Sequence, residues 1–294
     1  MDAPPRPPPR LARTAHKGDA GRVLCLAGSA AMPGAAILCA RAAQRAGAGL
    51  VAVGCLDALL ATVLPPAAPE AVLVDLCEAF ELGGRVRPGA AERLRARAPH
   101  AVLVGPGLGD DARTRALLAL VLETFDVPLV LDADALNALD GEPERLRAAR
   151  APLVLTPHPG EAARLAGRAL PEDDAGRAAA ARELAARSGA ILCLKGHGTV
   201  VAEPGGATWR NPSGNAGMAT AGAGDVLAGI LAAYLALVRS GADPAWTPAA
   251  AARAAVYVHG LAGDLAAEAR GERALIASDL VEALPAAQRR FEGA

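Results

Sequence analysis

The chain has 294 residues, of which 52% are hydrophobic, 21% are charged and only 2% are aromatic. A chain of this length and composition can bury a large core, and it is not intrinsically disordered. Its formal net charge of −1 provides no basic surface for nucleic acid, so any phosphate group must be held by local geometry.

The first 15 residues form a proline-rich lead-in that lacks the apolar stretch of a signal peptide. The sequence contains no unbroken apolar run of about 20 residues, the length that would cross a bilayer. The five cysteines lie mostly in apolar runs and have no C-x-x-C spacing, which is typical of reduced core thiols. These features predict a soluble, cytoplasmic protein without a membrane partner.

Apolar runs typical of buried strands alternate with helical patterns over most of the chain. Strands are expected at 22–27, 50–54, 71–75, 101–104, 128–132, 152–156 and 190–195. Helices are expected at 34–46, 57–64, 111–123, 160–166 and 175–188. Continuous apolar strands separated by helices indicate a parallel sheet that is covered on both faces.

The pattern changes after residue 195. A short hairpin is expected from 199–202 and 208–211, and helices follow at 224–238, 248–268 and 278–290, the last with Ser278 as its N-cap. No linker or internal repeat divides the chain. The sequence therefore predicts that residues 16–294 form one α/β domain of three layers (α/β/α) with a mainly parallel central sheet.

Open α/β sheets bind ligands beyond the carboxyl ends of their strands. Most of the distinctive polar and glycine-rich segments follow a predicted strand: GS at 28–29, GPGLG at 105–109, DAD at 132–134, TPHPGE at 156–161 and KGHGT at 195–199. These segments should therefore meet at one edge of the sheet, which predicts the mouth of a site there.

The segment GAGD at 222–225 opens a predicted helix. The bare backbone amides of Gly222 and Gly224 at a helix N-terminus would form an anion hole. A carboxylate beside that hole suits a base that takes the proton of a hydroxyl attacking phosphorus. These four residues alone favour equally the simpler alternative, in which Asp225 is an N-cap.

Three other segments have two interpretations each. GPGLG has the spacing G-x-G-x-G and not G-x-G-x-x-G, so it indicates either close approach to a ligand or a tight turn. The glycines beside His197 either let a nucleotide lie against the main chain or form a β-turn. The acids of DADALN at 132–137 lie at a strand end, where Asp134 could simply cap a helix.

The segment TPHPGE places Pro159 at the first position of a helix, with His158 as its cap and Glu161 as its third residue. Glu161 either complements the helix dipole or, at a phosphate site, holds Mg²⁺ directly or through water. His158 is by itself equally compatible with a polar core residue.

Together these segments resemble the ADP- or ATP-dependent NAD(P)H-hydrate dehydratases of the ribokinase-like superfamily. The resemblance runs in order over nearly the whole chain, through HKGDAG at 16–21, MPGAA at 32–36, VGPGLG, LDADALNAL, TPHPGE, LKGHGT and NAGMATAGAGDVLAG at 215–229. It implies a ribokinase-like fold and a lyase that dehydrates the S epimer of NADH or NADPH hydrate, releasing phosphate and AMP from ADP, or ADP from ATP.

The resemblance also implies roles for individual residues. Asp225 would be the catalytic base and would line the hydrate pocket together with Ala35, Gly107 and His158. The nucleotide would be bound by Lys195, Gly196, His197, Gly198, Thr199, Gly222 and Gly224.

Mg²⁺ is the expected cofactor, with ADP or ATP as the phosphoryl donor. Many ribokinase-like enzymes carry an Asn-x-x-Glu element near the metal, and His158-Pro159-Gly160-Glu161 stands in its place here. This departure leaves direct ligation by Glu161 open, and a contact through water is the alternative.

The expected partners are the hydrate, the nucleotide and further copies of the chain, a tetramer being one arrangement. The few residues before HKGDAG cannot form a second fold, so a separate hydrate epimerase is expected. The main alternative function is a ribokinase-like kinase of a hydroxymethylpyrimidine, a thiazole alcohol or a sugar. Such a kinase would share GAGD but not the full set of MPGAA, HPGE and KGHGT. A non-catalytic nucleotide-binding protein is a second alternative.

Overall fold

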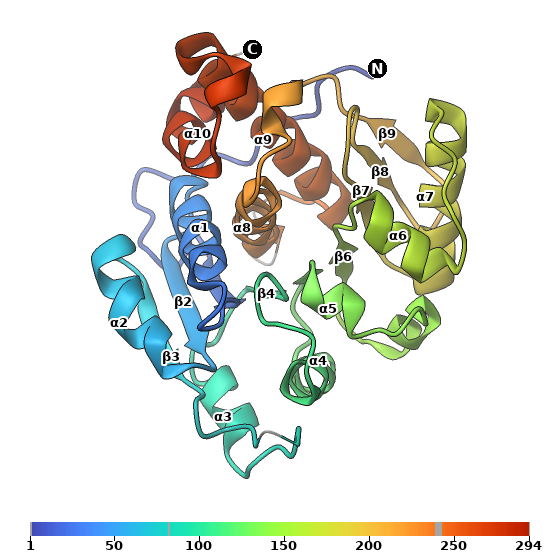
Figure 1. The fold of residues 1–294 in the computed structure, drawn as a ribbon. Coiled ribbons are helices and arrows are strands. Elements are labelled where there is room, and N and C mark those ends of the chain that lie inside the picture. Colours follow the sequence, from blue (N-terminus) through green and yellow to red (C-terminus); the bar gives the residue numbers. More distant parts are fainter. Residues whose placement is uncertain (1, 82, 239–242, 294) are drawn as a thin grey trace.

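The computed structural model describes residues 2–293 except 82 and 239–242, and its centre is a single sheet (Figure 1). The described residues form nine strands: β1 (Arg22–Leu26), β2 (Leu50–Cys55), β3 (Val72–Asp75), β4 (Ala101–Val104), β5 (Leu129–Leu131), β6 (Leu153–Leu155), β7 (Ile191–Leu194), β8 (Val200–Ala202) and β9 (Thr208–Arg210). Their order in the sheet is β3-β2-β1-β4-β5-β6-β7-β8-β9. The pairs from β3 to β7 are parallel, and β8 and β9 add an antiparallel hairpin. Every expected strand is therefore confirmed.

Helices follow most of the strands. They are α1 (Pro33–Arg45), α2 (Ala58–Ala67), α3 (Ala90–Arg95), α4 (Ala112–Thr124), α5 (Asp134–Asn137), α6 (Pro159–Ala166), α7 (Asp174–Ser188), α8 (Ala223–Ala236), α9 (Pro248–Arg270) and α10 (Ala277–Glu292), with 3₁₀ helices at Pro143–Ala148, Ala216–Met218 and Glu272–Ala274. The sequence did not predict α3, α5 or any of these three 3₁₀ helices.

The helices cover both faces of the sheet, as expected for continuous apolar strands. Along β1, Val23 and Cys25 point into a core formed with α1, α2, α8, α9 and α10. Leu24 and Leu26 point into a second core formed with α3, α4, α5, α6 and α7. The period-two alternation of a strand thus divides one apolar run between two cores, and the predicted three-layer architecture is confirmed.

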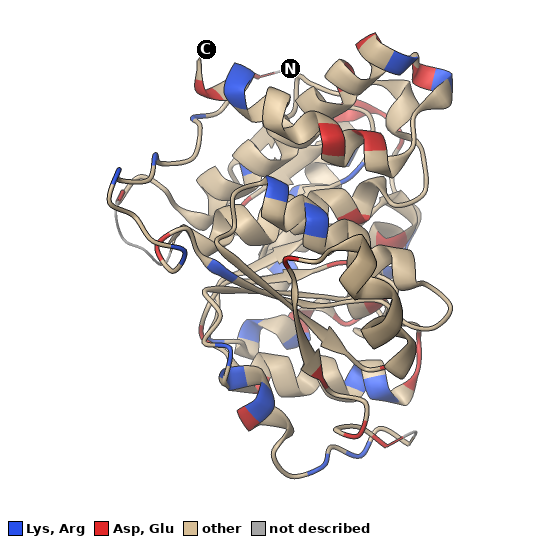
Figure 2. Cartoon of the chain, turned by 90° about the vertical axis from the view of Figure 1, so that its left-hand side faces the viewer, with Lys and Arg blue, Asp and Glu red and all other residues tan. Residues whose placement is uncertain are grey.

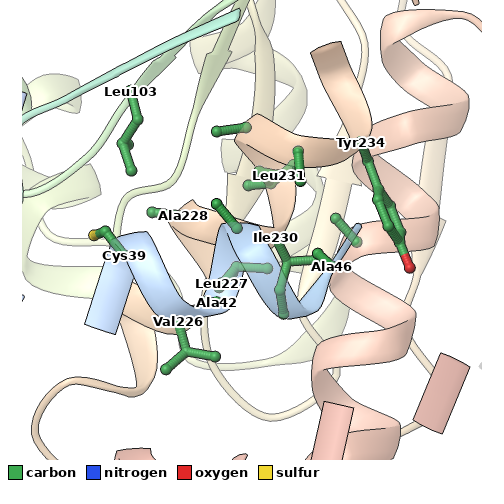
Figure 3. Close-up of a cluster of buried hydrophobic side chains, with 14 of the residues drawn as sticks. Cys39, Ala42, Ala46, Leu103, Val226, Leu227, Ala228, Ile230, Leu231 and Tyr234 are labelled. Carbon is green, nitrogen blue, oxygen red and sulfur yellow. The ribbon is translucent and has the colours of Figure 1, made fainter. Parts of the chain in front are cut away.

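Helix α8 lies in the middle of the first core and is buried along nearly its whole length. Figure 3 shows its residues Leu227, Ala228 and Ile230 beside α1. A Cβ on Gly229 would lie 2.4 Å from the carbonyl oxygen of Cys39, so the two helices pack with almost no space between them. Small residues permit this close approach of α1 and α8, where aromatic side chains would prevent it. The close packing fixes the position of the N-terminus of α8.

The expectation that Ser278 caps α10 is wrong. The helix begins at Ala277, and Ile276 holds the cap position. The Asp279 carboxylate accepts the N–H of Ile276 at 3.1 Å. The acid at the third helical position therefore binds the N–H of the N-cap residue itself, as in one half of a capping box.

The proline-rich lead-in is bound to the edge of the sheet. The backbone N–H of Asp2 donates to the carbonyl oxygen of Arg210 at 3.2 Å, and the Trp209 indole donates to the carbonyl oxygen of Ala3 at 3.0 Å. These contacts cover β9, an edge strand whose backbone would otherwise be unpaired.

Charged residues of both signs are interspersed in the view of Figure 2, in keeping with the formal net charge of −1. In the part of the chain that the structure describes, no helix is both long and apolar enough to cross a membrane. All five cysteines are free thiols, and four of them are buried, which confirms their expected role in the core.

Candidate functional site

The segments that the sequence placed at strand ends follow five neighbouring strands of the sheet, β1, β4, β5, β6 and β7. These strands are parallel, so their carboxyl ends share one edge. The structure therefore brings the predicted segments to the same edge, where the N-terminus of α8 also lies.

Asp225 is the third residue of α8 and not its N-cap, because Gly222 occupies that position with a left-handed backbone (φ 87°). The alternative of an ordinary N-cap aspartate is therefore wrong. The carbonyl oxygen of Asp225 accepts the thiol of Cys39 from α1 at 3.4 Å. The backbone of the first turn of α8 is thus held by the core, and the Asp225 side chain is not needed to cap the helix.

Lys195 provides the positive charge of this site. Its Nζ lies 2.8 Å from Asp132 Oδ1 and 3.9 Å from Glu161 Oε2. A Cβ on Gly224 would lie only 3.2 Å from the same Nζ, so the lysine lies directly against the first turn of α8. Burial alone would lower the pKa of Lys195, but the charges of Asp132 and Glu161 outweigh it and raise that pKa. Lys195 is therefore a firmly protonated cation.

Asp225 is costly to ionise in this environment. Burial, followed by the charge of Asp132, raises its pKa to about 6, and Lys195 opposes the shift. An acid with a pKa this close to neutrality can release and accept protons in solution at physiological pH, as a general base must.

His158 and Glu161 form a reciprocal cap at the start of α6. His158 Nδ1 accepts the N–H groups of Gly160 at 3.0 Å and Glu161 at 3.3 Å, and Glu161 Oε2 accepts the N–H of His158 at 2.7 Å. The expected positions of His158, Pro159 and Glu161 in the helix are confirmed. Burial raises the pKa of Glu161, while Lys195 and the bond from His158 oppose the shift.

Asp134 connects two of the predicted loops. Its Oδ2 accepts the N–H of Gly109 at 2.8 Å, and its Oδ1 accepts the amide of Asn137 at 3.3 Å. The N-cap of α5 is Ala133, so the alternative of Asp134 as a helix cap is wrong. Ala133 has φ 49° and ψ −113°, which costs backbone energy in a residue other than glycine. This strain lies between the two acids of the DAD segment.

Ala35 and Gly107 meet where α1 begins. A Cβ on Gly107 would lie 2.8 Å from the Cβ of Ala35, so only glycine permits this approach. A different space, a cavity of about 490 Å³, lies between α5 and α6. It is lined by Asp110, Leu136, Asn137, Asp140, Gly141, Glu161, Arg164 and Leu165. Glu161 is the single predicted site residue on its wall.

The KGHGT segment (residues 195–199) is held by arginines that the sequence did not identify. Arg177 on α7 donates to the carbonyl oxygens of His197 at 2.6 Å and Lys195 at 3.3 Å. A Cβ on Gly198 would lie 2.4 Å from Arg210 Nε. The glycines of this segment are thus required by the packing of arginine side chains as well as by their positive φ values. No sequence signal distinguishes Arg177 from the other arginines of α7.

The first turn of α8 thus brings together backbone amides at a helix N-terminus, one protonated lysine and a weakly acidic carboxylate. Amides and a cation at a helix N-terminus can bind a transferring phosphoryl group. A carboxylate next to them can accept the proton of the attacking hydroxyl. The site therefore has the chemical groups for phosphoryl transfer to an alcohol.

Comparison with known proteins agrees with this chemistry. A family model described as NAD(P)H-hydrate dehydratase matches residues 23–286. The ADP-dependent (S)-NAD(P)H-hydrate dehydratase of Neisseria meningitidis is 40% identical over 276 residues, which is 92% of this chain and 86% of that protein. The bifunctional NAD(P)H-hydrate repair enzyme of Moorella thermoacetica is 42% identical over 285 residues, and the match spans 97% of this chain but 52% of that longer protein.

A solved structure gives the same result. The ADP/ATP-dependent NAD(P)H-hydrate dehydratase of Bacillus subtilis, co-crystallised with ATP and Mg²⁺, superposes with a TM-score of 0.80 at 33% identity, covering 97% of this chain and 94% of that one. A protein of Enterococcus faecalis described as ribokinase-like has a TM-score of 0.77 at 27% identity. The fold is ribokinase-like, and the chain belongs to the NAD(P)H-hydrate dehydratase family.

Proposed function

We propose that this protein is a nucleotide-dependent NAD(P)H-hydrate dehydratase that acts on the S epimer of NADH or NADPH hydrate and restores the reduced cofactor. The observation that carries this proposal is the carboxylate of Asp225, which has a pKa of about 6 in the first turn of α8, close to Lys195. The family membership supplies the substrate class.

In the first step, the ring hydroxyl of the hydrate attacks the terminal phosphorus of ADP or ATP, and Asp225 takes the hydroxyl proton. The bond from phosphorus to the bridging oxygen breaks, and AMP or ADP leaves. In the second step, the ring nitrogen donates its electron pair, the bond from carbon to the ester oxygen breaks, and inorganic phosphate leaves. Loss of a proton from the neighbouring ring carbon then restores the reduced nicotinamide.

The nucleotide is assigned to the KGHGT segment (Lys195, Gly196, His197, Gly198 and Thr199) and to Gly222 and Gly224. Arg177 donates hydrogen bonds to two carbonyl oxygens of this segment and so constrains its backbone, which supports the assignment. The hydrate is assigned to Ala35, Gly107, His158 and Asp225. The close contact of Ala35 with Gly107 supports a preformed wall for its ring.

Mg²⁺ would neutralise the transferred phosphoryl group when bound. Among the described residues, no cluster of three or more His, Cys, Asp or Glu side chains is arranged to hold a metal ion. Mg²⁺ usually binds one or two carboxylates together with substrate phosphates. The charges of Asp132 and Asp134, which both raise the pKa of Asp225, indicate surplus negative charge that suits a cation arriving with the nucleotide.

Glu161 is proposed as a contact to that cation through water. Its carboxylate already accepts the N–H of His158 and lies within 3.9 Å of Lys195 Nζ, so two partners compete with direct ligation. His158 Nε2 also lies 3.4 Å from Glu161 Oε1.

We further propose a cytoplasmic homo-oligomer, such as a tetramer, that works with an NAD(P)H-hydrate epimerase. The free thiols support a reducing compartment. The bifunctional name of the Moorella relative supports a functional link to a second repair activity.

The experiment is incubation of the protein with NADH hydrate and either ADP or ATP, with Mg²⁺, followed by the absorbance of reduced nicotinamide. We expect absorbance to recover only with nucleotide, together with inorganic phosphate, and to stop on exhaustive chelation. Accumulation of a stable phosphorylated product would indicate a kinase instead, and ADP binding without any product would indicate the non-catalytic alternative.

A further inference from the structure

The glycine-rich loop (residues 211–222), which precedes the first turn of α8, is bound along α9. The Asn211 side chain donates to the carbonyl oxygen of Val256 at 3.2 Å, and the Ser213 hydroxyl donates to that of Tyr257 at 2.8 Å. The sequence pattern predicts α9 only as one of the helices that close the chain. Its polar groups instead bind the start of the loop.

Asp264 on α9 binds the next two residues of the loop. Its Oδ2 accepts the N–H of Gly214 at 2.9 Å, and its Oδ1 accepts the Asn215 amide at 3.0 Å. Both carboxylate oxygens are therefore used on one loop, and charge-assisted hydrogen bonds are stronger than neutral ones.

Two glycines of α9 permit the close approach of the loop. A Cβ on Gly260 would lie 2.3 Å from Ser213 Oγ, and a Cβ on Gly263 would lie 2.3 Å from Met218 Sδ. The face of α9 between residues 256 and 264 is thus shaped to the loop by hydrogen bonds and by the absence of side chains.

His259 lies on the same stretch of α9 and reaches the end of the loop. Its Nε2 is 2.9 Å from the carbonyl oxygen of Ala223, the first residue of α8. A carbonyl oxygen only accepts hydrogen bonds, so Nε2 carries the proton and donates it. Burial lowers the pKa of His259 to about 4, and the ring is therefore neutral at physiological pH.

The carbonyl of Ala223 and the N–H of Gly224 belong to one planar, trans peptide unit. A hydrogen bond that holds the oxygen at one end therefore also fixes the direction of the N–H at the other end. That N–H is one of the amides assigned above to the nucleotide phosphates, and Asp225 is the next residue.

We propose that His259 is a positioning residue for the phosphate-binding turn, and that it acts by anchoring the peptide plane between Ala223 and Gly224. The role rests on the proposed function, because it concerns the amide that would bind the transferred phosphate. His259 itself acts through Gly224 and takes no part in proton transfer.

The test compares three substitutions. His259→Leu replaces the ring by an apolar side chain and removes the donor. His259→Gln places an amide N–H near the position of Nε2, whereas His259→Asn places it near Nδ1. We expect His259→Leu and His259→Asn to weaken ADP binding about tenfold, the effect of one lost hydrogen bond. His259→Gln should restore binding to within about threefold of the parent.

Turnover gives a second readout. A misdirected phosphate-binding amide should reduce kcat by about 10- to 100-fold in His259→Leu. The KM for the hydrate should stay within about twofold, because three of the four residues assigned to the hydrate, Ala35, Gly107 and His158, lie on other elements. Phe291→Leu is the matched control, because Phe291 packs on the ring of Tyr257 with centroids 5.0 Å apart, whereas Tyr257 binds the loop through its backbone carbonyl. The substitution should lower the melting temperature and leave the hydrogen bonds of the loop in place. ADP binding by this control should equal that of the parent.

The role of His259 is refuted if His259→Leu binds ADP as the parent does, or if the Gln and Asn variants behave alike. If His259→Leu does not fold, the comparison of Gln with Asn decides. ADP titration needs no hydrate. A parent that binds ADP but repairs no hydrate would refute the proposed function, and the ADP affinities of the His259 variants could still be compared. A parent that bound neither ADP nor ATP would refute both.

Discussion

The carboxylate of Asp225 is charged at neutral pH, although burial and the nearby charge of Asp132 both disfavour its ionised form. Its pKa is raised from 3.8 to about 6, so the folded state binds this proton more tightly than the unfolded state does. Between these two pH values, folding stability rises as pH falls, and above about pH 6 the full cost of ionisation is present. The residue is therefore a source of instability near neutral pH.

Asp225→Asn should remove this cost. We expect the variant to melt at a higher temperature than the parent at about pH 8, and the gain to disappear as the pH falls below about 4. Turnover should fall by about 10²–10⁴, the usual contribution of a general base. Calorimetry at several pH values and single-turnover rates measure both effects. Lower stability at about pH 8, or activity within about tenfold of the parent, would make Asp225 a structural residue.

Asp111 provides the matched control for this substitution. It is a true N-cap, whose Oδ1 accepts the N–H groups of Arg113 at 2.9 Å and Thr114 at 3.0 Å. Burial would raise the pKa of Asp111, but the hydrogen bonds from Thr114 and Arg113 lower it overall. Asp111→Asn should therefore destabilise the protein at about pH 8, which is the opposite sign.

Lys195 should set the pH dependence of the reaction. Because Asp225 must be deprotonated, kcat/KM should fall below about pH 6. The charge of Lys195 lowers the pKa of Asp225, so Lys195→Met should move this acid limb to higher pH in addition to slowing the reaction. The measurement is the pH profile of kcat/KM for the two proteins. An acid limb that stays in place or moves to lower pH would show that Lys195 does not act on Asp225.

Among the elements of the fold, the KGHGT segment shows how a glycine motif can serve two purposes. Gly198 has φ 59°, and a side chain there would strike Arg210. We expect Gly198→Ala to weaken ADP binding, and Arg210→Ala in the same chain to restore part of it. Calorimetric titration of the two single variants and the double variant gives the coupling. Strictly additive losses would mean that the new methyl group meets the nucleotide and not the arginine.

The sequence predicted helices and strands correctly where a local pattern of apolar and turn residues determines them. Most strands are continuous apolar runs between turn residues, and β9 (Thr208–Arg210) was found as the second strand of a hairpin. Helix α5 was missed because it has only four residues, too short for a helical period, and its Asp134 binds Gly109 from another loop. Ser278 was wrongly taken as a cap because the helix begins one residue earlier, at Ala277, and the carboxylate of Asp279 binds the N–H of Ile276 at the cap position.

The sequence predicted those residues of the candidate site that belong to recognisable motifs. Asp225, Lys195 and His158 were identified because their segments follow strands or open helices. Arg177, His259 and Asp264 were not, because each acts on backbone that is distant in the sequence, and only the packed fold brings them together. Side chains that hold the backbone of a site, without contacting its ligands, belong to no motif with a fixed spacing in the sequence.

At the scale of the whole molecule, the geometry of the site predicts selectivity between the two epimers of the hydrate. The hydroxyl must reach Asp225 while its oxygen lies in line with the phosphorus, and an inverted carbon cannot meet both demands in one pocket. Given an epimer mixture and excess nucleotide, absorbance should rise quickly and then stall until an epimerase is added. A single phase to full conversion without epimerase would show that the pocket accepts both epimers.

The central claim is that the hydroxyl is phosphorylated before it leaves, and isotope transfer tests it most directly. Hydrate that carries ¹⁸O in the ring hydroxyl is converted by the protein in unlabelled water with ADP and Mg²⁺, and the inorganic phosphate is analysed by mass spectrometry. Because the ester forms by attack of that oxygen on phosphorus, and the bond from carbon to oxygen breaks afterwards, each released phosphate should contain the label. Unlabelled phosphate, with the ¹⁸O recovered in water, would show direct dehydration beside an independent hydrolysis of the nucleotide, and it would contradict the role assigned to Asp225.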